Sequence, residues 1–369
     1  MSGTITRLET FEILIPLPKP LLMGAMYIAE REYTFVRIHD DEGNIGTSYG
    51  LSRNAPISAT IERLISPRWI NQKIDDHDDF YTRTAKANAF LGTNGIFWRA
   101  LSLADCALYD LLAKRANQPL CEYLGGSVKT IPATVAGCYP VADETPASLI
   151  EQMQHMAEYK PAGIKITSSS DYARDTERMT ICRQAIPDGP GFINDVYCGA
   201  KDAESLLVEA RKWHDLNMMW LEDPFTFDDY DNVGKLADGL PYPVGQGDEQ
   251  CGLLHFERLI ELGHIQVLRL DATACGGVRG FLEAAKLAEK YNIPISTHIF
   301  HHLHGQLAAA VPNVKWIEYM LPESNVESIH AVWNSNLEWK DGGLALTDAP
   351  GVGFDWNEEA ITHYRSGTA

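Results

Sequence analysis

The segment MMWLEDPFTFDDYDNVGKLADGLPYPVGQGD, residues 218–248, contains the unit that recurs through the second half of the chain. It has two short apolar runs, MMWLED and YPVGQGD, separated by a stretch with the polarity pattern of a helix. Runs of the same kind occur on both sides as IPATVAG (131–137), AGIKIT (162–167), GFIND (191–195), VLRLDA (267–272), PISTH (294–298) and KWIEY (315–319). A strand-then-helix repeat predicts parallel strands joined by right-handed helical crossovers.

The number of these units helps to separate two α/β architectures. Eight strands within about 200 residues favour a closed β/α barrel, although the repeat alone also fits an open, doubly wound sheet. Residues 4–50 have the pattern of antiparallel strands and residues 56–125 have helical periodicity, which predicts an α+β domain ahead of the barrel. We therefore expect an N-terminal α+β domain at 1–127, a barrel at 128–335 and a C-terminal segment at 336–369 that packs back on the first domain.

Composition and charge argue against several classes of protein. The apolar share of 45% and the charged share of 22% are ordinary for a globular chain. A net charge of -19 without a basic tract argues against nucleic acid and anionic membranes as partners. Because the sequence has no bilayer-spanning apolar run and no signal-peptide pattern, we expect a cytoplasmic protein. The seven cysteines form no CxxC pair and predict neither disulfides nor a structural zinc site.

Polar residues end nearly every predicted barrel strand. In chain order they are Lys165, Asp195, Glu222, Asp248, Asp271, His298 and Glu318, each about one strand-helix unit from the next. The carboxyl ends of barrel strands converge on one mouth, where active sites are built, so these side chains could share a pocket. A single charged residue at the end of a strand is more often a helix cap or part of a solvated edge than a catalytic group.

Five of these residues form two chemically distinct sets. Asp195, Glu222 and Asp248 would repel one another unless a hard cation lay between them, and oxygen ligands with open positions suit Mg²⁺. Three exposed caps are the alternative. Asp271 and His298 end the next two strands, where a carboxylate beside an imidazole would fix its tautomer and raise its basicity. For His298, the alternative is a core histidine with a satisfied hydrogen bond.

The ordered motifs resemble a known family. WLEDPF, GFIND, GQGDEQ, LDATACGGVRG, THIF and WIEYM, preceded by ALYDLLAKRANQPLCEYLGG, are similar in order and spacing to the mandelate racemase group of the enolase superfamily. The resemblance covers almost the whole chain. It implies a modified (β/α)7β TIM barrel closed by an N-terminal α+β capping domain, and relatives of this fold suggest a symmetric homo-oligomer.

The resemblance also implies a metal site and its chemistry. Mg²⁺ would be held by Asp195, Glu222 and Asp248, with Glu249 as the fallback for the third ligand. The ion would bind the carboxylate of a small-molecule substrate and stabilise the enediolate that forms when the α-proton leaves.

The proton-transfer groups follow from the same resemblance. His298, oriented by Asp271, would act as base or acid on one face of the substrate, and Glu318 would hydrogen-bond the far side of its carboxylate. The second strand departs from the family pattern of Lys-x-Lys, because this chain has AGIKITSSS with one lysine. One alignment puts Lys165 at the carboxylate-binding position and Thr167 at the catalytic one; the other leaves Lys165 between the two positions.

This ambiguity affects the predicted reaction. If Thr167 replaces the catalytic lysine, a dehydratase is favoured, because one histidine can serve first as base and then as acid. The substrate would be an acid sugar, an aldonate or aldarate, and the product a 2-keto-3-deoxy acid. If Lys165 is catalytic, a racemase, an epimerase or a lactone cycloisomerase is an equal candidate. The muconate-lactonising subgroup is disfavoured, because its lysine would fall near Ala274. A non-catalytic carboxylate-binding protein is a further alternative, although it would need no His298–Asp271 pair.

Several other residues are candidates for contact with the substrate. The resemblance places Tyr27, Arg31 and Tyr49 in or near mobile capping loops, and Tyr197 stands where family members often have asparagine. Solvent-exposed loop residues would explain the capping positions equally well. The run HIFHHLHG suggests a zinc site at first sight, but histidines at these spacings after a strand point in different directions.

Overall fold

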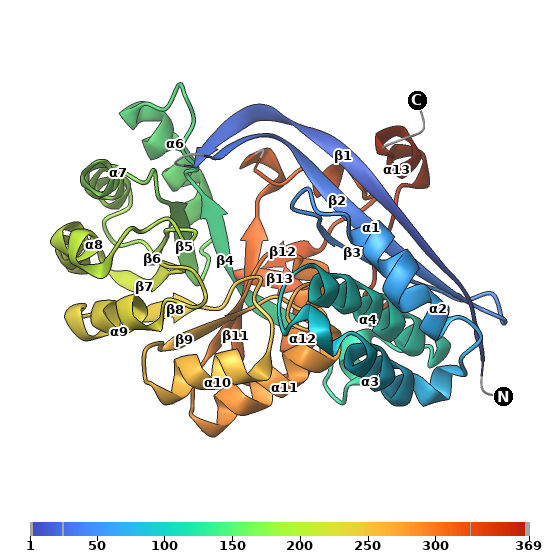
Figure 1. Cartoon of the computed structure of the whole chain (residues 1–369). Helices are drawn as coiled ribbons and strands as arrows, with labels where there is room; N and C mark the ends of the chain where they lie inside the picture. Colours follow the sequence, from blue (N-terminus) through green and yellow to red (C-terminus); the bar gives the residue numbers. More distant parts are fainter. Residues whose placement is uncertain (1–2, 24–25, 325, 366–369) are drawn as a thin grey trace.

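A computed structural model describes residues 3–23, 26–324 and 326–365 of the chain. An antiparallel sheet and its helices lie beside a closed barrel of parallel strands (Figure 1). The first sheet is a meander of β1 (Ile5–Met23), β2 (Met26–Asp40) and β3 (Ile45–Leu51). Its helices are α1 (Ile57–Thr60), α2 (Ser66–Trp69), α3 (His77–Ala87), α4 (Ile96–Arg115) and α5 (Leu120–Tyr123). The predicted α+β domain ahead of the barrel is therefore confirmed.

Eight parallel strands form the barrel. They are β4 (Thr130–Gly137), β5 (Gly163–Thr167), β6 (Gly191–Asp195), β7 (Met218–Glu222), β8 (Val244–Gln246), β9 (Val267–Leu270), β10 (Ile295–Thr297) and β11 (Val314–Met320). Each strand pairs with the next in the chain, and β11 pairs with β4 to close the ring. Closure distinguishes the barrel from the doubly wound sheet that the repeat alone had left possible.

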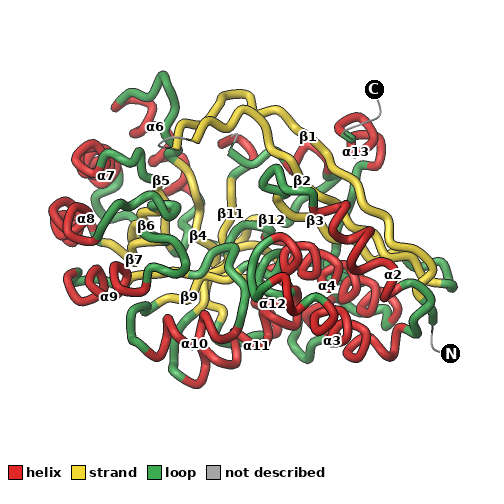
Figure 2. The backbone as a smooth tube through the Cα atoms, in the orientation of Figure 1, coloured by secondary structure: helices red, strands yellow, loops and turns green. Residues whose placement is uncertain are grey.

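Seven helices connect these strands and pack on the outside of the ring (Figure 2). They are α6 (Pro146–Glu158), α7 (Tyr172–Ala185), α8 (Ala203–Ala210), α9 (Tyr230–Gly239), α10 (Leu253–Glu261), α11 (Gly277–Lys290) and α12 (His301–Ala310). The predicted (β/α)7β order is thus confirmed within the described part of the chain.

The C-terminal segment contacts both domains. Its hairpin of β12 (Glu338–Lys340) and β13 (Gly343–Ala345) adds to β4 in antiparallel register. The last helix, α13 (Glu358–Tyr364), lies against β1, and Trp356 packs edge-on against Phe35 of β2 with ring centroids 5.0 Å apart. The domain boundaries at 127/128 and 335/336 stay predictions.

The long hairpin of β1 and β2 reaches across the barrel toward β4 and β5 (Figure 1). Near its tip, the backbone N–H of Leu22 donates to the carbonyl of Pro140 at 2.8 Å, and Leu17 and Leu21 pack with Tyr139 and Val326. The capping domain thereby covers one side of the barrel mouth. Among the described residues, no helix is both long and apolar enough to cross a membrane.

Candidate active site

Alternation along the barrel strands brings polar side chains above an aromatic floor. Residues two positions apart on a strand point the same way, so Glu222 follows Trp220 and Glu318 follows Trp316 inside the barrel. The two indole rings lie with their centroids 5.5 Å apart. Because the Nε1–H of Trp220 donates to Glu222 Oε2 at 2.8 Å, the floor also orients a carboxylate.

Three carboxylates meet above this floor. Glu222, Asp248 and Glu318 each have an oxygen within 4.8 Å of the others, and Glu222 and Glu318 are fully buried. Asp195 lies beside this group and is connected to it through Lys165. The structure therefore brings the three predicted metal ligands into one mouth and adds Glu318 to the same cluster.

Lys165 lies among these carboxylates. Its Nζ is 2.7 Å from Glu318 Oε1, 2.9 Å from Glu222 Oε1 and 3.2 Å from Asp195 Oδ2. Burial alone would lower the pKa of Lys165, but the three surrounding negative charges outweigh it and raise the pKa well above its ordinary value. In this arrangement Lys165 is an ammonium held by three carboxylates.

Arg269 is a member of this cluster that our sequence analysis did not single out. It lies in β9 two positions before Asp271, is 1% exposed, and places its guanidinium against Glu222, Asp248 and Glu318. The available signal was the two-residue period, because any residue two before an inward-facing Asp271 also faces inward.

The two cations affect the buried glutamates differently. Burial raises the pKa of Glu222 to about 7 against the opposing charges of Arg269 and Lys165. For Glu318 burial acts in the same direction, but Lys165 and Arg269 outweigh it and hold the pKa at about 2. Glu318 is therefore ionised at neutral pH, so it accepts hydrogen bonds.

His298 and Asp271 form the predicted pair at the mouth. His298 Nδ1 lies 2.9 Å from Asp271 Oδ2, and Asp271 Oδ1 accepts from both the N–H and the hydroxyl of Thr273 at 2.7 Å. Burial would lower the pKa of His298, but the charge of Asp248 and the hydrogen bond with Asp271 raise it to about 9. Because Nδ1 faces Asp271, Nε2 is the nitrogen left for proton transfer.

Tight turns follow the strand-end residues. Among the non-glycine residues with positive φ are Tyr197 (41°) after β6, Asp223 (40°) after β7, Glu249 (54°) after β8 and Ile299 (21°) after β10. A positive φ is uncommon for any side chain and strained for a β-branched one. The backbone therefore turns sharply just after the strand ends that carry Asp195, Glu222 and His298.

A cavity of about 300 Å³ opens above the cluster. Lys165, Asp195, Asp248 and His298 line it from the barrel. Met26, Ile28, Arg31, Leu51 and Arg53 line it from the capping domain. Glu249, the fallback ligand, also faces the cavity, but Arg53 Nη2 lies 2.8 Å and Arg99 Nη1 lies 3.1 Å from its carboxylate. The walls of this cavity therefore come from both domains.

The predicted substrate contacts do not all reach this cavity. Arg31 and Tyr197 line it, whereas Tyr27 is 67% exposed and lies between the lining residues Met26 and Ile28. Thr167 ends β5 fully buried and is not among the residues that line the cavity, although it pairs in register with the lining residue Asp195. Alternation along β2 thus presents the neighbours of Tyr27 to the cavity in its place.

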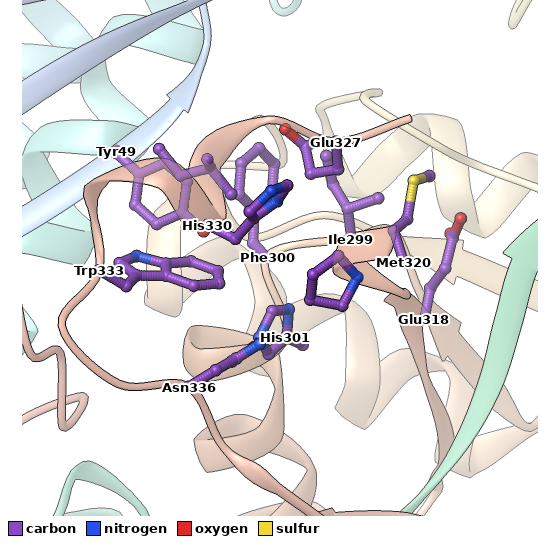
Figure 3. A pocket seen from close by; sticks show the side chains of 12 residues that line it. Tyr49, Ile299, Phe300, His301, Glu318, Met320, Glu327, His330, Trp333 and Asn336 are labelled. Atoms are coloured by element: carbon purple, nitrogen blue, oxygen red, sulfur yellow. Dashed lines mark hydrogen bonds between the residues drawn. The ribbon is translucent and has the colours of Figure 1, made fainter. Parts of the chain in front are cut away.

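Tyr49 belongs to a second, smaller cavity of about 20 Å³, which has room for about one water molecule (Figure 3). The two cavities share the side chains of Ile299, Met320 and Glu327 as a common wall. Burial raises the pKa of Glu327 to about 7 against the opposing charge of Arg31. Sequence reasoning missed Glu327 because it lies beyond β11, in a segment without a strand-end pattern.

Two of the remaining histidines of HIFHHLHG, His301 and His304, have hydrogen-bond partners. His304 Nδ1 lies 2.6 Å from the carbonyl of Ile299, and His304 Nε2 accepts from the N–H of Ala272, so both ring nitrogens are used. His301 Nε2 lies 2.8 Å from Asn336 Oδ1. Neither of the two potential metal-ligating groups found among the described residues includes His301, His302 or His304.

The donor set of the cluster fits a hard divalent cation. All its ligating atoms are carboxylate oxygens, which Mg²⁺ prefers. Asp248 Oδ1 is buried and has no hydrogen-bond partner among the described residues. A carboxylate oxygen left in this way is costly unless a positive charge approaches it.

Comparison with known proteins extends over both domains. Residues 6–125 match the family model for the mandelate racemase / muconate lactonizing enzyme N-terminal domain, and residues 148–360 match the enolase C-terminal domain-like model. The chain belongs to the mandelate racemase/muconate lactonizing enzyme family of the enolase superfamily. The family resemblance that the motifs had indicated is therefore confirmed.

Curated relatives in this family catalyse more than one type of reaction. L-talarate/galactarate dehydratase of Salmonella typhimurium is 28% identical over 96% of this chain and 86% of that protein. D-galactarolactone cycloisomerase of Agrobacterium fabrum is 24% identical over 98% of both chains. A solved structure of the Salmonella dehydratase with Mg and L-lyxarohydroxamate superposes with a TM-score of 0.88 at 25% identity, covering 99% of this chain and 94% of that one. Family membership thus leaves a lyase and an isomerase as candidates.

Proposed function

We propose that this family member is a Mg²⁺-dependent dehydratase that converts an acid sugar, an aldonate or aldarate, to a 2-keto-3-deoxy acid. One observation carries the proposal. A single general base, His298 held by Asp271, faces a cavity in which the lysine, Lys165, is already bound by carboxylates. Dehydration can use one histidine as base and then as acid, whereas racemisation needs proton-transfer groups on both faces of the α-carbon.

Asp195, Glu222 and Asp248 would hold the ion, which supplies positive charge to the substrate carboxylate when bound and so favours the enediolate. Lys165 lines the cavity beside two of these ligands. Its ammonium would bind the same substrate carboxylate from the barrel side, together with the metal.

His298 would carry both proton transfers. Its neutral Nε2 takes the α-proton, and the C–H electron pair passes into the carboxylate to give the enediolate. The imidazolium then gives this proton to the β-hydroxyl, the Cβ–O bond breaks and water leaves. The resulting enol tautomerises to the 2-keto acid. Asp271 would hold Nδ1–H throughout, so that Nε2 stays the reacting nitrogen.

The capping domain would select the rest of the substrate. Arg31 and Arg53 reach the cavity from β2 and from the loop after β3, and Tyr197 lines it from the barrel. Cations and a phenol suit the hydroxyl groups and any distal carboxylate of an acid sugar. Substrate selection would therefore depend on side chains outside the proton-transfer machinery.

A racemase, an epimerase or a lactone cycloisomerase is the second candidate. The observation in its favour is that Lys165 lines the same cavity as His298, so it could serve as a second proton-transfer group once substrate and metal redistribute the charges around it. In the racemase or epimerase case, the α-proton still exchanges, but no bond at Cβ breaks and no 2-keto product forms. A homo-oligomeric assembly also stays a prediction.

The proposal is tested with purified protein, Mg²⁺ and a panel of aldonic and aldaric acids. Two readouts are taken: 2-keto product by semicarbazide absorbance, and deuterium incorporated at the α-carbon from D₂O. The variant is His298→Asn, and the matched control is His214→Asn, which changes an exposed histidine outside the cavity. We expect keto product from wild type and from the control but not from His298→Asn.

The outcomes separate the candidates. Deuterium exchange without keto product would contradict the dehydratase and favour the isomerase. Neither product nor exchange on any acid, together with tight carboxylate binding, would favour a non-catalytic binding protein.

A further inference from the structure

The guanidinium of Arg269 contacts three side chains of the carboxylate cluster. Its Nη2 lies 2.6 Å from Glu318 Oε2 and 3.2 Å from Asp248 Oδ2, and its Nε lies 3.1 Å from Glu222 Oε2. Its Nη1 donates to Ser296 Oγ at 2.7 Å and to the carbonyl of Thr297 at 2.8 Å. One planar group thus spans three acidic side chains and is itself anchored to β10.

Arg269 contacts one of the two oxygens of each carboxylate. These oxygens are Glu222 Oε2, Glu318 Oε2 and Asp248 Oδ2. The opposite oxygens are directed elsewhere, because Glu222 Oε1 and Glu318 Oε1 contact Lys165 Nζ, and Asp248 Oδ1 has no hydrogen-bond partner. A carboxylate held at one oxygen keeps a fixed orientation for a ligand at the other.

Arg269 does not reach the substrate cavity. It is 1% exposed and is absent from the residues that line the cavity, whereas Lys165 is present. The side chain can therefore influence the chemistry only through the groups that it contacts, which are the three carboxylates and the end of β10. This makes it a positioning residue and not a catalytic one.

The charges explain why such a residue is needed. Asp195, Glu222, Asp248 and Glu318 bring four carboxylates together in a largely buried site. Lys165 and Arg269 are the cations in direct contact with them among the described residues. Like charges at these separations repel strongly in a low-dielectric interior. Without Arg269, Lys165 would be the one cation among the described residues that still contacts these carboxylates directly.

We propose that Arg269 keeps the metal-ligand carboxylates assembled in the absence of metal, so that the site is preformed and the fold does not depend on Mg²⁺. The inference rests on the proposed function, because it takes these carboxylates as the metal ligands. When Arg269 is removed, the two positive charges of a bound divalent ion would have to offset the repulsion among these carboxylates.

The test is thermal unfolding of the full chain in EDTA and in saturating MgCl₂. Wild type is compared with Arg269→Met and Arg269→Lys, and with Arg178→Met as matched control. Arg178 is also buried, at 3% exposed, and pairs with Glu144 at 2.8 Å, but it contacts none of the proposed ligands. The Mg²⁺ increment in the midpoint is the readout, because loss of packing alone would not change it.

We expect Arg269→Met to lower the midpoint in EDTA by roughly 10 °C, as for a broken buried ion pair, and Mg²⁺ to restore at least half of the loss. Arg269→Lys keeps the charge but not the fork, so its increment should lie between those of wild type and Arg269→Met. Arg178→Met should lose stability equally with and without Mg²⁺. If Arg269→Met is soluble only when prepared with Mg²⁺ and unfolds on chelation, the inference is also supported.

Two results would overturn it. An equal midpoint loss for Arg269→Met with and without Mg²⁺, while wild type still gains from the ion, would make Arg269 a packing residue and leave the proposed cofactor intact. An absence of any Mg²⁺ response in both proteins would remove the proposed cofactor together with the inference.

Discussion

Three carboxylates surround the imidazole of His298 and determine its proton affinity. Asp271 touches Nδ1, whereas Asp248 and Glu249 act through their charge. Burial opposes them, and the net result is a pKa of about 9. A divalent ion beside Asp248 would cancel part of that charge and bring the pKa closer to neutrality, where a base is most effective.

Replacing Asp271 tests this account. A base acts in its neutral form, so activity should rise with pH through the pKa of His298 and level off above it. Asp271→Asn removes a charge that raises this pKa, so the rising limb should move to lower pH. The plateau should fall by roughly 10² or more, because the tautomer is no longer fixed. Deuterium exchange from pH 5 to pH 10 measures both effects; a limb that stays in place or moves to higher pH would contradict the assignment.

Glu327 provides a second prediction for a single residue. Its pKa of about 7 means that this carboxyl, in the wall shared by the two cavities, gains a negative charge as pH rises through neutrality. An anionic substrate should then bind less well, so KM should increase between pH 6 and pH 8. In Glu327→Gln this increase should disappear. The same pH dependence of KM in both proteins would assign it to another group.

At the level of elements, Glu249 links the barrel to the capping domain. It follows β8 and contacts Arg99 of α4 and Arg53 of the loop after β3. Both arginines come from the domain that closes the cavity. The loop after β3 is therefore held at the mouth by charge-assisted hydrogen bonds to a barrel residue.

Glu249→Gln should loosen this loop. The kinetics are measured at pH 10, above the pKa of His298, so that loss of the Glu249 charge hardly changes the fraction of neutral imidazole. Because both contacts weaken, we expect KM to rise roughly fivefold to tenfold, with a smaller change in kcat. Steady-state kinetics on the best acid from the panel measures the two separately. Glu204→Gln, which breaks an exposed pair with Lys235 on the barrel surface, is the control and should change neither. A fall in kcat alone would mean that Glu249 acts on the chemistry directly.

The sequence was sufficient to predict the elements but not the faces that some of them present. The strand-then-helix repeat predicted the barrel, and strand-end positions predicted His298 and Asp271 as a pair. Tyr27 could not be placed, because its neighbours Met26 and Ile28 are also apolar and the register of β1 with β2 decides which face meets the cavity. Arg269 was overlooked because an arginine inside a buried strand becomes understandable only when its three carboxylate partners, from other strands, are known.

At the scale of the whole molecule, one buried carboxylate connects three distant segments. Asp110 of α4 is fully buried, and its Oδ2 accepts from the backbone N–H of Thr47 in β3 at 2.7 Å. Its Oδ1 accepts from the N–H of Val352 in the C-terminal segment, also at 2.7 Å. Lys114 Nζ lies 2.7 Å from Oδ2 and balances the charge. The capping sheet, the capping helix and the C-terminal segment therefore share one anchor.

Removing this anchor should destabilise the molecule without changing its chemistry. Asp110→Ala leaves the buried N–H groups of Thr47 and Val352 without acceptors, which should cost about 3 kcal/mol in the free energy of unfolding. It should also expose residues 336–365 to protease before the barrel is cut. Asp110→Asn keeps one carbonyl acceptor and should lose less. Urea unfolding and timed proteolysis measure these effects.

Because Asp110 lines neither cavity, kcat of the folded fraction should stay at the wild-type value. Equal stability of Asp110→Ala and wild type, or protection of the C-terminal segment in the variant, would show that its other contacts, such as β13 on β4 and Trp356 on Phe35, hold this segment without Asp110.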